Sequence, residues 1–356
     1  MAVTSGTYNF LSTTSQQMID EAWERAGLLP DVITHQKIIT AQRSANLILT
    51  EWINKGYNLW TSTISLIGLF TDQGRYFLPK NVSDVIDVNA RTFQRPLGGT
   101  AFSSAGGNAA SVFGGAGPCT QAAPNGYISY DYGAGVQYEI TSVGVLSAAN
   151  LTYTLSYEWS SDNVNWFSSL FSQPTAYNNV DTIWLDMLVP QNAEFFRIRE
   201  TGGATLNITQ IYFVTNTTDT VMARISGQEW MTYPNKFLAS KPSVWWLDRQ
   251  TPQVELVIWP VPLPQYQVLQ VRYITMLQDV GAMTNSVNIP ARFYDAFCSA
   301  MAKRLAMKKD GPLDYERIAL LDKQEREAYS YAATEDTEKV PLRLIPSYLT
   351  GWSYVS

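Results

Sequence analysis

Charge is divided unevenly along this 356-residue chain, and this division constrains the fold more than any other feature of the sequence. Residues 1–95 carry 8 basic and 8 acidic side chains, residues 96–218 carry 2 and 8, and residues 219–356 carry 15 of each. The whole net charge of -6 therefore lies in the middle segment. A composition change between two balanced flanks indicates one domain inserted into another. We predict a discontinuous domain (1–95 and 219–333), an inserted domain (96–218) and an extended arm (334–356).

Both flanks contain helix patterns. Apolar side chains recur at helical spacing in three stretches, at about residues 15–27, 34–55 and 290–309. A last helix, at about 313–331, is charged on most faces. Hydroxyls in Ser12–Ser15 can cap the first helix, and Gly27 can end it. We expect the helices of the two flanks to pack together. The side chains predicted to be buried between them are Trp23, Ile48, Trp52, Phe293 and Phe297.

Short alternating stretches predict β-strands in all three segments. In the flanks they are residues 59–70, 85–93, 244–248, 254–259 and 268–274. In the insert they are residues 138–145, 151–157, 195–199 and 206–213, after an irregular entry loop at 96–126 that is rich in Gly, Ala and Ser. The predicted fold class is α+β. It comprises a helical bundle with a small β-sheet region in one discontinuous domain, and an inserted all-β sandwich.

Composition excludes several classes of function. A pI of about 5.0 argues against a basic face that clamps DNA phosphates. A single histidine, His35, excludes a multi-histidine zinc site, and we expect no metal and no cofactor. Two distant cysteines give no disulfide framework and suit a reducing compartment. We expect no targeting segment and no membrane span, because the first residues are small and polar and no long apolar run exists.

Motifs in both flanks resemble those of the head-to-tail adaptor, or connector, proteins of tailed bacteriophages. Before the insert they are Tyr8–Phe10, Ile19–Gly27, Ala41–Leu47, Glu51–Trp60 and Gln73–Pro79. After it they are Arg224–Ser226, Glu229–Trp230, Lys236, Lys241–Pro242, Trp245–Arg249, Trp259–Pro260, Asp279–Val280 and Pro290–Phe293, followed by the helix through Leu305–Ala306. Each motif alone is weak, but they occur in the family's order. The resemblance covers about 230 residues outside the insert.

The resemblance implies a virion structural protein at the head–tail junction, assembled in the host cytoplasm, rather than an enzyme. Such a protein would form a homo-oligomeric ring, a dodecamer in most members of the family. It would dock under the portal protein, bind a downstream tail or nozzle protein, and let packaged DNA pass without sequence-specific contacts.

The predicted arm carries the residues that would dock to the portal or to a neighbouring subunit. They are Leu342, Leu344, Ile345, Tyr348, Leu349, Trp352 and Tyr354. Pro341 and Pro346 block regular helix, and the residues before them favour extended backbone. The segment is too apolar for an idle solvated terminus and too short to bury these side chains by itself. A strap folded back on its own domain remains the alternative.

The insert resembles a discoidin-type, or galactose-binding-like, sandwich. The motifs that carry this likeness are Ile140–Val145, Ser161–Trp166 and Phe196–Glu200. It supports an alternative function as a carbohydrate- or receptor-binding tail protein. Trp159 and Trp184 are the candidates for a platform on which a sugar ring could stack.

A third alternative is an enzyme, such as a tail-associated glycan hydrolase. Glu139, Glu158 and Asp162 could supply its pair of carboxylates, although acids beside turns of strands are commoner. Because no acid–base constellation is recognisable, we predict no catalytic residue. The glycine run Gly114–Gly117 lacks the Lys and Ser/Thr of a phosphate-binding loop.

Overall fold

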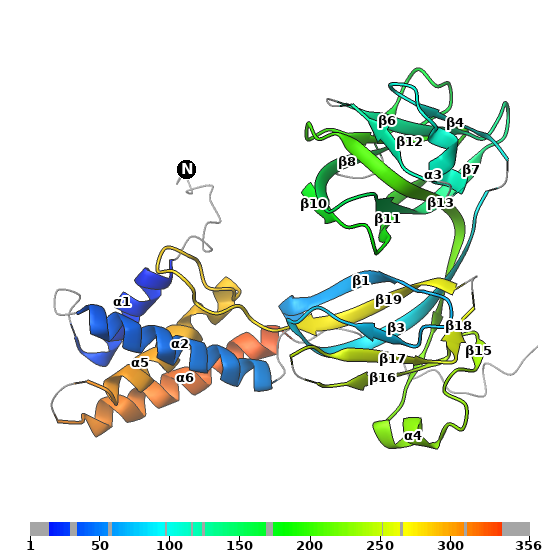
Figure 1. Cartoon of the computed structure of the whole chain (residues 1–356). Coiled ribbons are helices and arrows are strands. Elements are labelled where there is room, and N and C mark those ends of the chain that lie inside the picture. Colours follow the sequence, from blue (N-terminus) through cyan, green and yellow to red (C-terminus); the bar gives the residue numbers. More distant parts are fainter. Residues whose placement is uncertain are drawn as a thin grey trace, which may run out of the picture. The chain divides into compact units, whose positions relative to one another are not determined.

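The computed structural model falls into two compact units. It describes residues 14–28, 34–55, 59–96, 98–114, 117–122, 125–168, 174–250, 252–263, 266–309 and 312–336. One unit combines Met1–Ser62 with Thr275–Ser356, and the other is Thr63–Ile274. The two ends of the chain therefore meet in one unit, and the middle of the chain forms the other (Figure 1).

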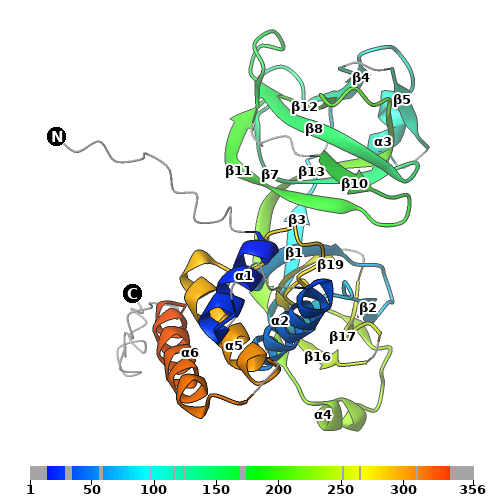
Figure 2. The same ribbon diagram turned by 90° about the vertical axis from the view of Figure 1, so that its left-hand side faces the viewer.

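The first unit is helical. Its elements are α1 (Ser15–Ala26), α2 (His35–Lys55), α5 (Tyr294–Ala306), α6 (Tyr315–Glu335) and the 3-10 turns η3 (Leu59–Thr61) and η4 (Ala291–Phe293). Helix α5 contacts α1, α2 and α6 (Figure 2). Thr14 and Gln17 form a capping box at the start of α1, and Gly27 ends that helix in a left-handed conformation.

The core of the helical unit joins the two ends of the chain. The Trp52 ring centroid lies 5.6 Å from that of Phe293 and 5.8 Å from that of Phe297. Trp23 and Ile48 belong to the same apolar cluster. All five side chains that the sequence predicted to be buried here are at most 2% exposed, so this prediction is confirmed.

The second unit is built from strands, and its longest strand links two halves. The largest sheet has the order β1-β19-β3-β13-β7-β11, with β5 also paired to β13. Its strands are β1 (Ser62–Gly68), β3 (Val82–Gln94), β5 (Cys119–Gln121), β7 (Tyr138–Ser147), β11 (Ile183–Ala193), β13 (Leu206–Val221) and β19 (Tyr266–Thr275). Strand β13 pairs with β3 near its end and with β7 before that, so it runs through both halves (Figure 1).

One half of the strand unit resembles a barrel. A sheet of β14 (Ala223–Arg224), β16 (Val244–Asp248), β17 (Glu255–Trp259) and β2 (Arg75–Phe77) faces β1, β3 and β19. Apolar side chains of both sheets share one core, and together the sheets are nearly closed. Outside the sheets lie the short helix α4 (Gly227–Thr232) and a pair of strands, β15 (Ala239–Ser240) and β18 (Val261–Pro262).

The other half is a β-sandwich, which confirms the predicted all-β insert. One layer is the sheet β10-β8-β12-β6-β4, with β9 on β8, and the other contains β7, β11 and the first part of β13. The strands of the first layer are β4 (Thr100–Ser103), β6 (Tyr127–Asp131), β8 (Leu151–Ser160), β9 (Phe167–Ser168), β10 (Pro174–Tyr177) and β12 (Phe195–Glu200). Both layers, together with the short helix α3 (Ala109–Gly114), contribute side chains to one apolar core.

The predicted α+β fold, a helical bundle with a small β-sheet region, is wrong. Strands make up 40% of the described residues and helices only 28%. Strands from the two flanks pair with each other, β1 and β3 with β19 and β2 with β17, and they enclose a core of their own. An alternating pattern shows which face of a strand is apolar but not which strand it pairs with. The sequence therefore predicts smaller sheets than the structure contains.

The two ends of the insert lie side by side. Gln94 on β3 is paired with Thr215 on β13, close to the ends that the sequence suggested near Pro96 and Thr218. This agrees with the proximity that an inserted domain requires. The independence of residues 96–218 as a separate domain stays a prediction.

Candidate functional site

A pocket of about 290 Å³ opens where the sandwich meets the end of β1. Trp184 and Tyr212 contribute aromatic rings to its lining. Gln210, Thr71 and Thr182 contribute polar side chains that can donate and accept hydrogen bonds. The pocket therefore combines ring surfaces with hydrogen-bonding groups, which is the usual composition of a small-molecule site.

A glycine on β7, between β11 and β13, creates the slot for Trp184. Gly144 on β7 is paired with Trp184 on β11 and with Tyr212 on β13. A Cβ atom at Gly144 would lie 3.0 Å from carbons of the Trp184 indole, so only glycine leaves room for the ring to lie flat on the sheet. The indole stacks on Tyr212, with centroids 5.4 Å apart and planes 24° apart.

A small apolar cluster fixes the back of the pocket. The Trp184 ring centroid lies 4.9 Å from that of Phe93 on β3, and Val214 and Val268 are buried beside them. Only 6% of Trp184 is exposed. The sequence singled out Trp184 but missed Tyr212 and Gly144. The usable signal was a lone glycine in the alternating run Ile140–Val145, because glycine inside a strand marks a close approach.

Trp159, the other residue of the predicted glycan platform, lies in a different cluster. It sits on β8, half-buried against the sandwich core, with its ring centroid 5.0 Å from that of Phe167 on β9. Phe167 is 53% exposed. The platform formed by Trp159 and Trp184 stays a prediction. Of these two tryptophans, Trp184 lines the pocket, together with Tyr212 and Phe70, and Trp159 does not.

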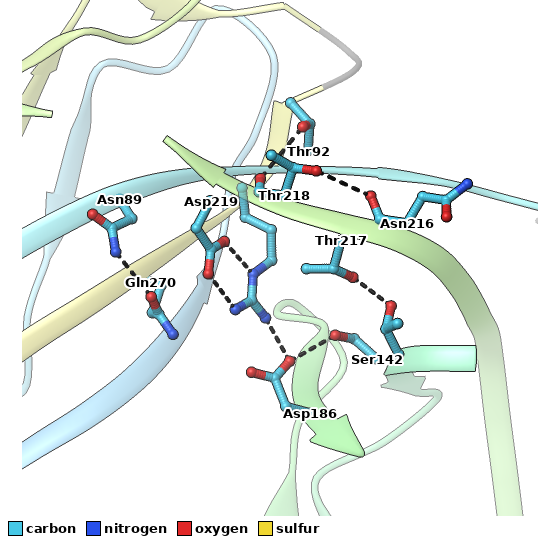
Figure 3. Close-up of polar contacts among 11 residues, drawn as sticks. Asn89, Thr92, Ser142, Asp186, Asn216, Thr217, Thr218, Asp219 and Gln270 are labelled. Atoms are coloured by element: carbon cyan, nitrogen blue, oxygen red, sulfur yellow. Dashed lines mark hydrogen bonds and ion pairs between the residues drawn. The ribbon is translucent and has the colours of Figure 1, made fainter. Parts of the chain in front are cut away.

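A buried arginine connects the barrel to the sandwich beside this site. Arg91 on β3 donates from Nε and Nη2 to the two carboxylate oxygens of Asp219 on β13, at 2.7 and 2.8 Å. Its Nη1 donates to Asp186 on β11, which also accepts a hydrogen bond from the Ser142 hydroxyl (Figure 3). Because the Arg91 side chain is only 5% exposed, these contacts satisfy a charge that would otherwise be buried without a partner.

Two of the three candidate catalytic carboxylates make structural contacts. Glu158 is buried and forms ion pairs with Arg197 and Arg199. The backbone N–H groups of Asn165 and Val164 donate to Asp162 and, with two side-chain donors, lower the pKa of its carboxyl below the ordinary value. The third candidate, Glu139, is exposed on β7 beside a polar pocket.

The remaining candidate residues fall in other places. All seven predicted docking residues, Leu342 to Tyr354, lie outside the described residues. His35 is the exposed first residue of α2. Both cysteines are buried thiols, and burial raises the pKa of Cys298 to about 12.

Within the described ranges, no group of three or more His, Cys, Asp or Glu side chains is arranged to hold a metal ion. No described helix is long and apolar enough to cross a membrane.

Comparisons with known proteins give structural neighbours but no sequence relatives. No protein-family model matches the chain, and no curated protein matches it. One structural neighbour is the CpGH89CBM32-6 module produced by Clostridium perfringens (TM-score 0.29, 13% identity, 33% of this chain and 94% of that one). Another is chitosan-binding module 1 from a chitosanase/glucanase of Paenibacillus sp. IK-5 (TM-score 0.28, 15% identity, 34% and 97%).

A third neighbour is the CBM32 module of AlyQ in complex with 4,5-unsaturated mannuronic acid (TM-score 0.28, 14% identity, 32% and 92%). These neighbours resemble about a third of the chain. At TM-scores below 0.5 the likeness does not by itself establish a ligand.

Proposed function

We propose that this protein binds carbohydrate through the pocket at Trp184 and Tyr212. The observation that carries the proposal is the pairing of a fixed indole and a phenol ring with an amide and two hydroxyls around one small cavity. Apolar atoms of the rings can contact the C–H groups of a sugar. Hydroxyl and amide groups can both donate to and accept from sugar hydroxyls.

The size of the pocket suggests a short ligand. Its volume of about 290 Å³ lies at the lower end of the range for small-molecule sites, roughly 300–1,000 Å³. One or two sugar rings are therefore the expected occupant. The site needs no movement of Trp184, because Phe93 and Gly144 already hold the ring in place.

The test is glycan-array screening of the full chain, followed by titration calorimetry with the best glycan. Gln210→Ala is expected to weaken binding about 2- to 10-fold through the loss of one neutral hydrogen bond. Trp184→Phe should also weaken it, because a smaller ring does not fill the slot over Gly144 and so alters the shape of the pocket. Gln36→Ala, on the exposed side of α2, is the matched control and should bind as the native chain does.

Melting temperatures establish that each variant is folded. The proposal fails if the native chain binds no glycan at millimolar concentration, or if Gln210→Ala and Trp184→Phe both bind as tightly as the control.

A second candidate is the head-to-tail adaptor that the flanking motifs resemble. A feature of the helical unit favours it. Helix α6 leaves large apolar side chains uncovered, with Tyr315 75%, Leu320 55% and Tyr331 76% exposed. Exposed apolar surface of this kind often marks a protein–protein contact. Under this proposal the chain forms a ring on the portal, with the predicted docking residues 342–354 attaching it to the portal or to a neighbouring subunit.

Truncation after Lys339 tests the adaptor function. Native protein should form closed rings in electron micrographs and should attach to portal-bearing capsids that keep their DNA. The truncated chain should attach poorly, because its apolar anchors are missing. Normal attachment and DNA retention by the truncated chain would contradict the role of the arm, and the absence of any ring would contradict the adaptor function itself.

A further inference from the structure

The loop between α4 and β15 displays large apolar side chains to solvent. Phe237 is 81% exposed, Met231 at the end of α4 is 76% exposed, and Leu238 is 43% exposed. We call these three residues the Phe237 surface. They lie outside the barrel sheets. Met231 is in α4, and Phe237 and Leu238 are in the loop that leads from α4 to β15 (Figure 1).

This exposure does not result from a loose backbone, because the loop is held by several contacts. The Phe237 N–H donates to Asn235 Oδ1 at 3.0 Å, and the Trp259 indole N–H donates to the Asn235 carbonyl at 2.9 Å. The N–H of Val261 donates to the Leu238 carbonyl at 2.9 Å. The backbone is therefore held on both sides of Phe237, at Asn235 by β17 and at Leu238 by β18.

Stacked rings underneath make the loop rigid. The Tyr233 and Trp259 rings lie 4.2 Å apart at an interplanar angle of 11°. The Lys236 ammonium donates to the Trp230 carbonyl and lies 4.5 Å from the centroid of the Trp230 ring. An apolar side chain presented by a fixed loop loses little further entropy on docking, so it is suited to anchor a partner.

Strand β15 adds a backbone site next to this surface. It follows Leu238 directly and pairs with β18 in a two-stranded sheet, so among the described residues its other edge has no strand beside it. An extended segment can add to such an edge through backbone hydrogen bonds while its side chains fill apolar contacts. Together, the edge and the Phe237 surface suit an extended, apolar chain.

We propose that the Phe237 surface and the edge of β15 bind the C-terminal segment, residues 340–356, of a second copy of this chain. The sequence of this segment is rich in apolar side chains, with Leu342, Leu344, Tyr348 and Trp352 spread along it. Its prolines, at 341 and 346, are tolerated in an edge strand but not in a central one. This proposal goes beyond carbohydrate binding and does not depend on it.

The length and position of the segment allow it to reach another molecule. Residues 337–356 follow the end of α6, and an extended chain of that length spans roughly 65 Å. The segment continues from α6 of the helical unit, and the surface belongs to the strand unit. A contact between different surfaces on two copies is heterologous and repeats from copy to copy, so it generates rings or filaments.

Sedimentation of the full-length chain tests the proposal. Native protein should associate in a concentration-dependent way. Phe237→Asp should weaken this association by at least about 30-fold, the effect of losing an interface anchor. Val164→Asp, at a side chain 77% exposed on a turn of the sandwich, is the matched control and should associate normally.

A mixing experiment identifies the occupant. The Phe237→Asp chain keeps its C-terminal segment, and a chain carrying Leu349→Asp with Trp352→Asp keeps its Phe237 surface. Each alone should be monomeric, at 39.8 kDa, and an equimolar mixture should form a heterodimer. A monomeric native protein, normal association of Phe237→Asp, or a mixture that stays monomeric would overturn the proposal. A monomeric native protein is the result expected if the segment folds back on its own chain.

Discussion

The Trp52→Ala variant is expected to lose about 3–5 kcal/mol of folding free energy in the helical unit. Trp52 is 2% exposed and contacts Phe293, Phe297 and Tyr329, which belong to η4, α5 and α6. Its removal deletes a large apolar surface and leaves a cavity at the point where the two ends of the chain meet. Urea unfolding followed by circular dichroism at the helix band measures the loss.

Leu47→Ala provides the control for Trp52→Ala. Leu47 lies on the same helix, α2, but is 56% exposed, so its truncation should change stability by less than about 0.5 kcal/mol. A loss below about 1 kcal/mol for Trp52→Ala would mean that the core of the helical unit does not depend on this side chain.

The Arg91→Ala variant should destabilise the strand unit by about 3–5 kcal/mol. The substitution removes the guanidinium that pairs with Asp186 and Asp219 and leaves the two carboxylates, which Figure 3 shows, without their arginine partner. The cost arises from the hydrogen bonds that Arg91 donates to the two carboxylates and from the packing of its buried side chain. The double variant Arg91→Ala/Asp219→Ala should recover part of the stability, because it also removes the less exposed of the two carboxylates. Thermal and urea unfolding of the full chain measure both effects.

Arg272→Ala serves as the comparison for Arg91→Ala. Arg272 pairs with Asp87, and their side chains are 40% and 54% exposed, so the loss should be below about 1 kcal/mol. Equal losses for Arg91→Ala and Arg272→Ala would contradict a special role of the buried arginine. Hydrogen exchange should also rise in β11 of Arg91→Ala, because Asp186 loses its contact with β3.

Local signals in the sequence were sufficient for the four long helices and for several strands, but not for the short helices α3 and α4. The apolar stripe ending at Ala26, followed by Gly27, matches α1 and its C-cap. The predicted strand 244–248 has the same bounds as β16, and the predicted strand 85–93 lies within β3. These elements were predictable because helical and strand periodicities are properties of neighbouring residues.

The candidate site was only partly predictable. Trp184 was recognised as an aromatic side chain on a strand of the insert, but its partners were not. Tyr212 and Gly144 meet it through strand pairing between three separate segments, and no spacing in the sequence encodes that register. The pocket therefore belongs to the assembled sheet rather than to any motif.

By itself, the sequence determined the four long helices, the faces of the strands and the presence of a sandwich between two flanks. Only the tertiary structure decided which strands pair. It joined β1, β3 and β19 into a sheet with its own core, separate from the helices. It also directed Arg91 on β3 toward Asp186 and Asp219. The physical reason is that periodicity fixes which side of an element is buried, whereas pairing, register and buried charge depend on contacts between distant residues.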